Sequence, residues 1–238
     1  MNNRDKLTVR GKNKDVAAFL ETVSKLPVTK NTGERGRLIV AIDATASRQP
    51  TWDRACQLQG DMFKQAAALG GLEIQLCFYR GHGEFSYSPW YQRSADLLKR
   101  MTGVFCLGGL TQIGKVLRHS VKETKKKKVH ALVFVGDCME ENVDALCHTA
   151  GQLGLLGVPV FLFHEGNDPQ AASAFQQIAR LSDGACCPFD SSSADQLREL
   201  LQAVAVFAAG GRRALMDYSR GRSGPVAALT HQLDKKKN

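Results

Sequence analysis

Three oxygen-bearing side chains stand at alternate positions directly after an apolar run near the start of the chain. The run extends from Leu38 to Ile42, and Asp43, Thr45 and Ser47 follow it. Alternate residues of an extended segment point to the same side, so these three side chains can present their oxygens to one point. Such a group suits a hard divalent cation. Asp, Ser and Thr are also favoured where a chain leaves a strand and caps the start of the next helix, so this plainer interpretation is an alternative.

A second apolar run, VHALVFVGD, also ends on an aspartate, Asp137. In an open parallel sheet, ligands bind beyond the carboxyl ends of the strands, at the switch point of the strand order. We therefore expect Asp43 and Asp137 to face the same point. Two carboxylates and several hydroxyls form an all-oxygen site, which suits Mg²⁺ because this ion prefers octahedral oxygen coordination and keeps waters or an outside ligand.

The elements that must position these residues alternate between strands and helices. Apolar runs predict buried strands at Leu38–Ile42, Leu72–Tyr79, VHALVFVGD, VPVFLFH and, weakly, Ala185–Phe189. Apolar residues at spacings of three and four predict helices over Trp52 to Ala66, Ser94–Met101, Ile113 to the Lys125–Lys128 run, Asn142 onward, Asp168-Pro169 to Leu181, and Ala194 to about Ala208. Glycines at 81 and 83 predict a hairpin turn into Glu84–Tyr87.

This order predicts an α/β fold: a doubly wound, mostly parallel central sheet with one antiparallel edge strand and helices on both faces.

Three motifs resemble those of the von Willebrand factor type A (VWA) domain. IVAIDATAS resembles its D-x-S/T-x-S motif, LGGLTQIGKVL resembles its threonine loop, and LVFVGD resembles its last metal-binding strand. Where that family often has Thr-Asp-Gly, this chain has Gly136-Asp137-Cys138. The resemblance covers about Arg37 to Ala208. It implies a metal-ion-dependent adhesion site (MIDAS) formed by Asp43, Thr45, Ser47, Thr111 and Asp137.

In the VWA family the hydroxyls usually bind the metal directly, and one or both aspartates act through water. A carboxylate from a protein partner takes the remaining position. The resemblance therefore implies a protein that is not an enzyme. It would act as a metal-dependent interaction module that holds Mg²⁺, or Mn²⁺ or Ca²⁺, and binds a Glu or Asp of a protein partner.

The chain has 238 residues and a formal net charge of +9. We expect a basic N-terminal extension over 1–36 with a short helix at Val16 to Lys25, a VWA-like domain over 37–209, and a basic C-terminal tail over 210–238. Nucleic-acid binding through the basic ends is an alternative function. The four lysines of Lys125–Lys128 suit the carboxyl end of a helix.

An enzymatic alternative starts from Asp43, because an aspartate after a first strand can be the nucleophile of a haloacid-dehalogenase-type phosphatase. Those enzymes commonly place a second acid two residues later, where this chain has Thr45. No G-x-G-x-x-G follows the first strand, which argues against dinucleotide binding. GGLTQIGK lacks the glycine spacing of a phosphate-binding Walker A loop.

Other polar and sulfur-bearing residues have plainer interpretations. Glu140 and Glu141 are expected to be exposed acids of a first helical turn, and His164 a satisfied or exposed histidine. The seven cysteines show no C-x-x-C spacing, and Cys186-Cys187 is expected to pack in a strand. With no apolar run near the roughly 20 residues that cross a bilayer, we expect no membrane contact and a reducing, cytoplasmic location.

Overall fold

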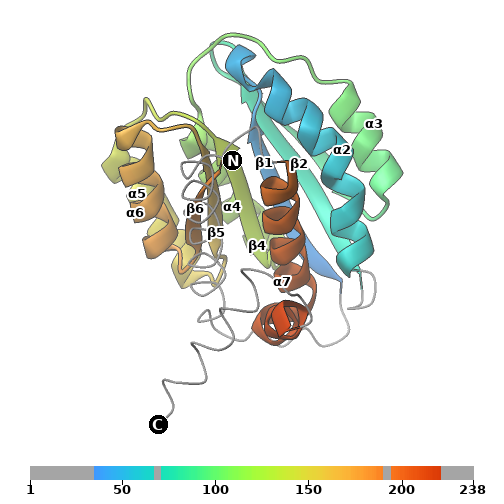
Figure 1. The fold of residues 1–238 in the computed structure, drawn as a ribbon. Helices are drawn as coiled ribbons and strands as arrows, with labels where there is room; N and C mark the ends of the chain where they lie inside the picture. The colour runs from blue at the N-terminus through green and yellow to red at the C-terminus, as the bar shows by residue number, and fades with distance from the viewer. Residues whose placement is uncertain (1–34, 67–70, 190–193, 221–238) are drawn as a thin grey trace, which may run out of the picture.

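The computed structural model describes residues 35–66, 71–189 and 194–220, and these form an α/β sandwich of three layers (Figure 1). The helix expected at Val16 to Lys25 lies outside the described residues. One six-stranded sheet has the order β3-β2-β1-β4-β5-β6. Its strands are β1 (Gly36–Asp43), β2 (Leu72–Arg80), β3 (Glu84–Tyr91), β4 (Ala131–Gly136), β5 (Val160–Glu165) and β6 (Ala185–Phe189).

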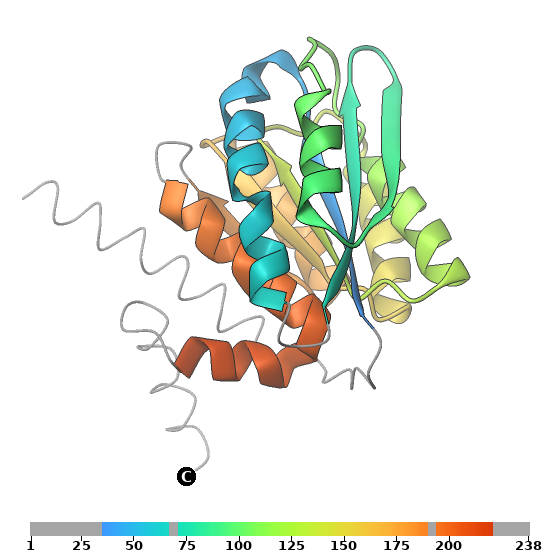
Figure 2. The same ribbon diagram turned by 90° about the vertical axis from the view of Figure 1, so that its right-hand side faces the viewer.

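Helices cover both faces of the sheet, as the views in Figures 1 and 2 show. The helical elements are η1 (Ala46–Arg48, a short 3₁₀ helix), α2 (Gln49–Ala66), α3 (Ser94–Thr102), α4 (Ile113–Lys126), α5 (Val143–Leu155), α6 (Pro169–Leu181) and α7 (Ala194–Arg220). The core on one face joins the sheet to α2, α3 and α7, and the core on the other joins it to α4, α5 and α6.

Double coverage explains the continuous apolar strands. On β1, Leu38, Val40 and Ile42 belong to the core under α2 and α7, whereas Ile39 and Ala41 belong to the core under α4. Both sides of the strand are therefore buried, and no polar alternation remains. The expected fold class is confirmed: β1 pairs in parallel with β2 and β4, whereas β3 is the antiparallel edge.

The edge strand β3 runs to Tyr91, four residues beyond the expected end. Ser88-Pro89 resembles a strand break in the sequence, because proline cannot donate to a sheet. An edge strand tolerates the loss of this donor. The register of β3 with β2 shifts between Gln75 and Cys77. The backbone nitrogen of Leu76 instead donates to the hydroxyl oxygen of Ser88 at 3.0 Å.

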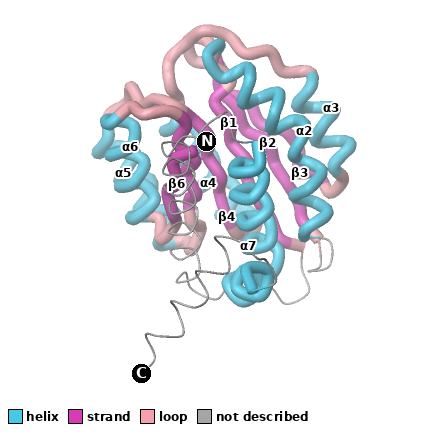
Figure 3. Tube along the Cα trace, in the orientation of Figure 1, coloured by secondary structure: helices cyan, strands magenta, loops and turns pink. Residues whose placement is uncertain are grey.

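Helix α7 also differs from expectation, because it extends to Arg220 rather than ending near Ala208 (Figure 3). Gly211 has φ of 70° and ψ of −168°, which interrupts the helical backbone there. Glycine adopts this conformation without steric cost, and the chain then resumes a helix. Leu215 beyond the kink is buried, and Tyr218 donates a hydrogen bond to Oε1 of Gln202 at 2.9 Å.

Most lysines of the run at the end of α4 contact other residues of the domain. Lys126 pairs with Glu123 at 2.6 Å, and Nζ of Lys127 lies 3.9 Å from the Glu73 carboxylate. Lys128 donates to the carbonyl oxygens of Leu156 and Gly157 at 2.6 and 2.7 Å. Three of the four lysines therefore neutralise internal acids or cover the carboxyl end of α5, which supports the interpretation of the run as a helix end.

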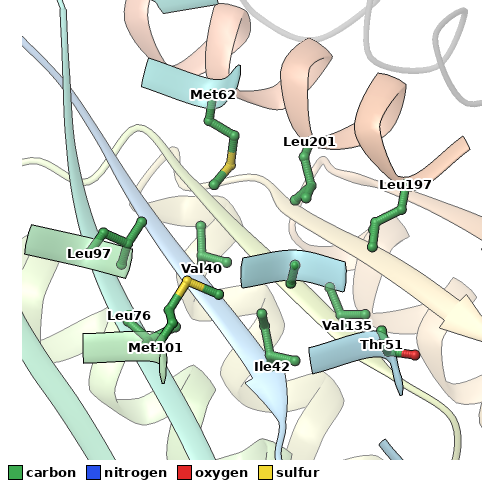
Figure 4. Close-up of a pocket in the computed structure, with 11 residues that line it drawn as sticks. Val40, Ile42, Thr51, Met62, Leu76, Leu97, Met101, Val135, Leu197 and Leu201 are labelled. Carbon is green, nitrogen blue, oxygen red and sulfur yellow. The ribbon is translucent and has the colours of Figure 1, made fainter. Parts of the chain in front are cut away.

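An enclosed apolar cavity of about 10 Å³ lies under α2, α3 and α7 (Figure 4). Among the described residues that line it, only Thr51 has a side-chain oxygen, and its hydroxyl already donates to Glu165. A space of this size holds at most about one water, which would also need several polar partners. The cavity is therefore a packing defect and not a ligand site.

Candidate metal centre

The carboxyl ends of β1 and β4 lie side by side at the point where the strand order reverses. From β1 the chain moves to β2 and β3 on one side, then returns to β4 on the other. Asp43 is the last residue of β1, and Asp137 follows the last residue of β4. The connection from α3 to α4, which carries Thr111, passes over this edge at the top of Figure 1.

A chain of hydrogen bonds joins four of the five predicted ligands. The backbone nitrogen of Thr45 donates to Oδ1 of Asp43 at 2.7 Å. The hydroxyls of Thr45 and Ser47 are 3.4 Å apart, and Ser47 donates to Oδ2 of Asp137 at 3.3 Å. The side-chain oxygens that follow β1 therefore reach Asp137, which lies 90 residues beyond Ser47 in the chain.

Asp43 is completely buried at the base of this group. Its second oxygen, Oδ2, accepts a hydrogen bond from the phenol of Tyr79 at 3.1 Å. Burial raises the pKa of the Asp43 carboxyl, and the nearby Asp137 carboxylate adds to the rise, while the hydrogen bonds from Thr45 and Tyr79 oppose it. The charged form of Asp43 is thus short of compensating positive charge, and a cation nearby would supply it.

Thr111 is buried at the same edge, but its hydrogen bonds go to a different acid. Its backbone nitrogen donates to Oε2 of Glu140, and its hydroxyl accepts from the backbone nitrogen of Glu140, both at 3.0 Å. Glu140 lies three residues beyond Asp137, so this pair ties the threonine loop to the loop after β4. Among the described residues, no hydrogen bond joins Thr111 directly to Asp43, Thr45, Ser47 or Asp137.

Glu141 differs from the exposed acid that the sequence suggests. Its carboxylate accepts hydrogen bonds from the backbone nitrogens of Ile113 and Gly114, the second at 2.9 Å. These nitrogens belong to the first turn of α4, where helical N–H groups have no partner inside the helix. Glu141 therefore caps α4 from another segment. Glu140 is exposed as expected, but both acids precede α5, whereas the sequence suggested that they lie in its first turn. The two acids together position the loop that carries Thr111.

The sequence interpretation missed two buried charged residues behind the group. Arg48, which follows Ser47, is 5% exposed, and Glu165, the last residue of β5, is 8% exposed. They form an ion pair, and Arg48 also lies 3.4 Å from Oδ2 of Asp137. Glu165 could have been found by the argument used for Asp43, because it too ends a parallel strand at this edge.

His164 and the pair Cys186-Cys187 lie on the neighbouring strands β5 and β6. His164 is buried, with Nε2 3.2 Å from the backbone oxygen of Asp137. It is therefore a satisfied histidine, as expected. Cys187 is buried in β6, and burial raises the pKa of Cys186 to about 12. A thiol with such a pKa is unreactive at neutral pH, which agrees with a packing role.

The donor set fits a hard divalent cation. Oδ1 of Asp137 is buried and has no hydrogen-bond partner among the described residues. A buried carboxylate oxygen without a partner is costly, and a cation would satisfy it. Within the described ranges, no group of three or more His, Cys, Asp or Glu is placed to hold a metal. A site here must therefore use the hydroxyls of Thr45 and Ser47 beside the two carboxylates, a set that suits Mg²⁺ more than softer metals.

The loop leading to Thr111 exposes apolar side chains next to this edge. Phe105 is 71% exposed, Leu110 54% and Leu107 48%. The loop is held in place, because Leu107 donates to the backbone oxygen of Ala44 at 3.0 Å. Three large apolar side chains exposed on one ordered loop favour a contact surface.

No helix among the described residues is long and apolar enough to cross a membrane.

Comparisons with known proteins identify the fold. No protein-family model matches the chain, and no curated protein matches it. Solved structures do match. The VWA domain of SpRpn10 has a TM-score of 0.54 at 14% identity, covering 70% of this chain and 94% of that one. Proximal thread matrix protein 1 from the mussel byssus, described with a zinc-occupied MIDAS motif, has a TM-score of 0.56 at 18% identity, covering 76% and 46%.

The pilus adhesin SpaC from Lactobacillus rhamnosus GG matches with a TM-score of 0.54 at 10% identity. The match covers 81% of this chain and 31% of the adhesin, so this chain corresponds to one part of that larger protein. Identities this low establish a shared fold and no more. The chain has the fold of a VWA domain, as the three sequence motifs imply.

Proposed function

We propose that this protein is a metal-dependent interaction module, which binds an acidic residue of a protein partner at the carboxyl edge of its sheet. The cation would be held by Asp43, Thr45, Ser47, Thr111 and Asp137. The observation that carries the proposal is the hydrogen-bonded chain from Asp43 through Ser47 to Asp137, together with the buried Oδ1 of Asp137, which has no hydrogen-bond partner among the described residues. Among the described residues, the one protein cation in contact with these oxygens is Arg48, 3.4 Å from Oδ2 of Asp137.

A bound divalent cation would supply a positive centre that an outside carboxylate can complete. Three of the proposed ligands are neutral hydroxyls, so they leave most of the positive charge of the ion in place. Asp43 is buried beneath the site, whereas Ser47 is exposed. An incoming carboxylate would therefore approach from the side of Ser47 and gain a charge-assisted bond at a partly desolvated surface.

The exposed loop side chains favour a protein as the partner. Phe105, Leu107 and Leu110 lie on the same loop as Thr111 and could pack against apolar residues flanking the partner's acid. A free small acid would not cover them. The mussel protein is described with a zinc-occupied MIDAS motif, which supports a divalent metal in a protein of similar fold, and we extend that property to this chain because it has the oxygens. Mg²⁺ is the ion we propose from the hardness of the donors.

The phosphatase alternative has no support from the geometry. Asp43 is 0% exposed, and both of its oxygens already accept hydrogen bonds. A nucleophile of this class must reach the phosphorus of its substrate, and a general acid should stand nearby. The residue two positions later, Thr45, cannot supply that acid. The basic ends that would bind nucleic acid fall largely outside the described residues, so that function stays an alternative.

Affinity capture from the native host tests the proposal. The full chain would be used as bait with Mg²⁺ and again with EDTA. Ser47→Ala removes one proposed ligand from an exposed position, and Ser173→Ala is the matched control because Ser173 is an exposed serine on α6. We expect a partner that is retained by the wild type and the control with Mg²⁺, and lost with EDTA or with Ser47→Ala.

The acidic residues of that partner would then be changed one at a time to the amide. One change should abolish binding as completely as EDTA does, because a single carboxylate completes the cation. If every amide variant still binds in Mg²⁺, or if EDTA has no effect, then the metal bridge is wrong.

A further inference from the structure

Arg48 places a buried positive charge beside the proposed metal site. Nη1 of its guanidinium lies 3.4 Å from Oδ2 of Asp137. Nη2 pairs with Oε2 of Glu165 and donates to the hydroxyl of Thr51 at 2.8 Å. Because Arg48 follows Ser47 within η1, the element that presents a proposed ligand also carries this cation.

The guanidinium is fixed between two acids by the neighbouring contacts. Thr51 donates its hydroxyl proton to the same oxygen of Glu165 that Arg48 pairs with. Glu165 is therefore held at the end of β5, and it draws Arg48 toward that strand. Glu165 and Arg48 are both almost fully buried, so solvent screens their charges weakly.

The two oxygens of Asp137 have different surroundings. Oδ2 accepts from Ser47 at 3.3 Å and faces Arg48, whereas Oδ1 is buried and has no hydrogen-bond partner in the part of the chain that the structure describes. Asp137 thus has one oxygen stabilised by protein charge and one left for another ligand. A cation that reaches Oδ1 must share the Asp137 carboxylate with the charge of Arg48.

We propose that Arg48 is an internal counter-cation that stabilises the metal-free site and weakens its affinity for divalent cations. Glu165 limits that effect by pairing with the same guanidinium. The inference rests on the proposed metal site and adds a role for two residues outside the ligand set. Because Arg48 offsets part of the negative charge of the site, a carboxylate from an acidic partner should strengthen metal binding, and a bound metal should strengthen partner binding by the same factor.

Electrostatics gives the sign of each effect. Removing Arg48 takes away a repulsive charge and should tighten binding of Mg²⁺, while removing the charge of Glu165 leaves Arg48 uncompensated and should weaken it. Breaking a buried ion pair by removing one partner also destabilises the fold, whereas removing both charges is milder. Affinity and stability should therefore change in different patterns across the variants.

The experiment measures the dissociation constant of Mg²⁺ by calorimetry for the full chain, stripped of metal with EDTA and dialysed. The four proteins are the wild type, Arg48→Met, Glu165→Gln and the double variant. Methionine approximates the length of arginine without its charge, and glutamine keeps an acceptor for Thr51. Arg48→Lys is added as a variant that keeps the charge but loses the fork of donors.

We expect Arg48→Met to bind Mg²⁺ about tenfold or more tightly than the wild type, and Glu165→Gln to bind several-fold more weakly. The double variant should fall between these two, and its urea unfolding should lie closer to wild type than that of Arg48→Met. If Arg48→Met does not fold, then the order of the remaining variants decides: the double variant must bind more tightly than Glu165→Gln. Arg48→Lys should stay within about threefold of wild type because it keeps the charge.

Failure of this inference is distinct from failure of the proposed function. A wild type that binds no Mg²⁺ at millimolar concentration contradicts both. A wild type that binds Mg²⁺, with folded arginine-free variants that bind no more tightly, contradicts the role of Arg48 alone. Loss of Mg²⁺ binding in those folded variants also overturns it, because Arg48 would then position Asp137 for the metal and not oppose the metal.

Discussion

Tyr79 and Asp43 are register partners on the parallel strands β2 and β1, and the phenol of Tyr79 donates to Oδ2 of Asp43 at 3.1 Å. Both side chains are completely buried. Burial raises the pKa of Tyr79 well above its usual value, and the Asp43 carboxylate adds to this, so the phenol stays protonated and remains a donor. The deepest residue of the proposed site is thus fixed by its neighbour on the next strand.

Replacing Tyr79 with phenylalanine should destabilise the metal-free protein. The Asp43 carboxylate would lose one of its donors inside the protein, which costs about 1–3 kcal/mol of unfolding free energy. Urea unfolding measures the loss. Asp43→Ala provides the reference background: there the phenol has no carboxylate to bond, so the same change should cost much less. An equal cost in both backgrounds would show that the Tyr79–Asp43 hydrogen bond contributes nothing.

Gly109 fixes the loop that carries Thr111. A Cβ there would lie 2.1 Å from the backbone oxygen of Gly81, in the turn between β2 and β3. Gly109→Ala must therefore push the loop away, and we expect a loss of about 1–3 kcal/mol in stability together with weaker Mg²⁺ binding. Gly108→Ala is the matched control, because a Cβ at Gly108 meets nothing within 4 Å. Similar behaviour of the two variants would contradict the close packing.

His119 gives the fold a dependence on pH that is separate from the metal site. Its ring is buried, 4.3 Å from the ring of Tyr87, and Nε2 lies 2.8 Å from Oε1 of Gln75. Burial lowers its pKa from 6.5; Glu123 opposes the shift, and Lys126 and Lys122 add to it. Its contribution to stability is thus complete above about pH 6.5 and is lost as the pH falls through the lower folded-state pKa.

We expect wild-type stability to fall more steeply than that of His119→Gln between about pH 7 and about pH 5, because glutamine takes up no proton. Glutamine can also donate to Gln75. Urea unfolding of both proteins across this pH range measures the difference in their unfolding free energies. The other titrating groups are the same in both proteins, so their contributions cancel in this difference. Parallel stability curves would mean that His119 keeps its ordinary pKa in the folded protein.

Much of the fold follows from patterns along the chain, because apolar strands and amphipathic helices have distinct periods. The end of α7 could not be predicted in this way. Gly210-Gly211 is typical of a helix end, and Gly211 is indeed non-helical, yet the helix continues beyond it to Arg220. The sequence pattern does not indicate that a second helical segment follows the kink and packs against the first. The contact of Tyr218 with Gln202 supplies that information only in three dimensions.

For the candidate site, the period of an extended strand places Asp43, Thr45 and Ser47, and the sheet topology adds Asp137. Thr111 came from the resemblance alone, and its bonds to Glu140 could not be foreseen from spacing. Arg48 was missed for a physical reason: a long side chain leaving a 3₁₀ turn can point to solvent or inward. Its inward direction follows from contacts with Glu165, Asp137 and Thr51, which only the folded structure brings together.

The central claim is that one divalent cation binds where β1 and β4 end. Calorimetric titration of Mg²⁺ into the EDTA-treated full chain tests it most directly. The wild type should bind a single ion. Asp43→Asn should bind at least about tenfold more weakly, because it removes a charge while keeping the size of the side chain; Thr111→Ala should weaken binding nearly as much, and Ser173→Ala should match wild type. Wild-type protein that binds no ion, or Asp43→Asn that binds as wild type does, would contradict the account.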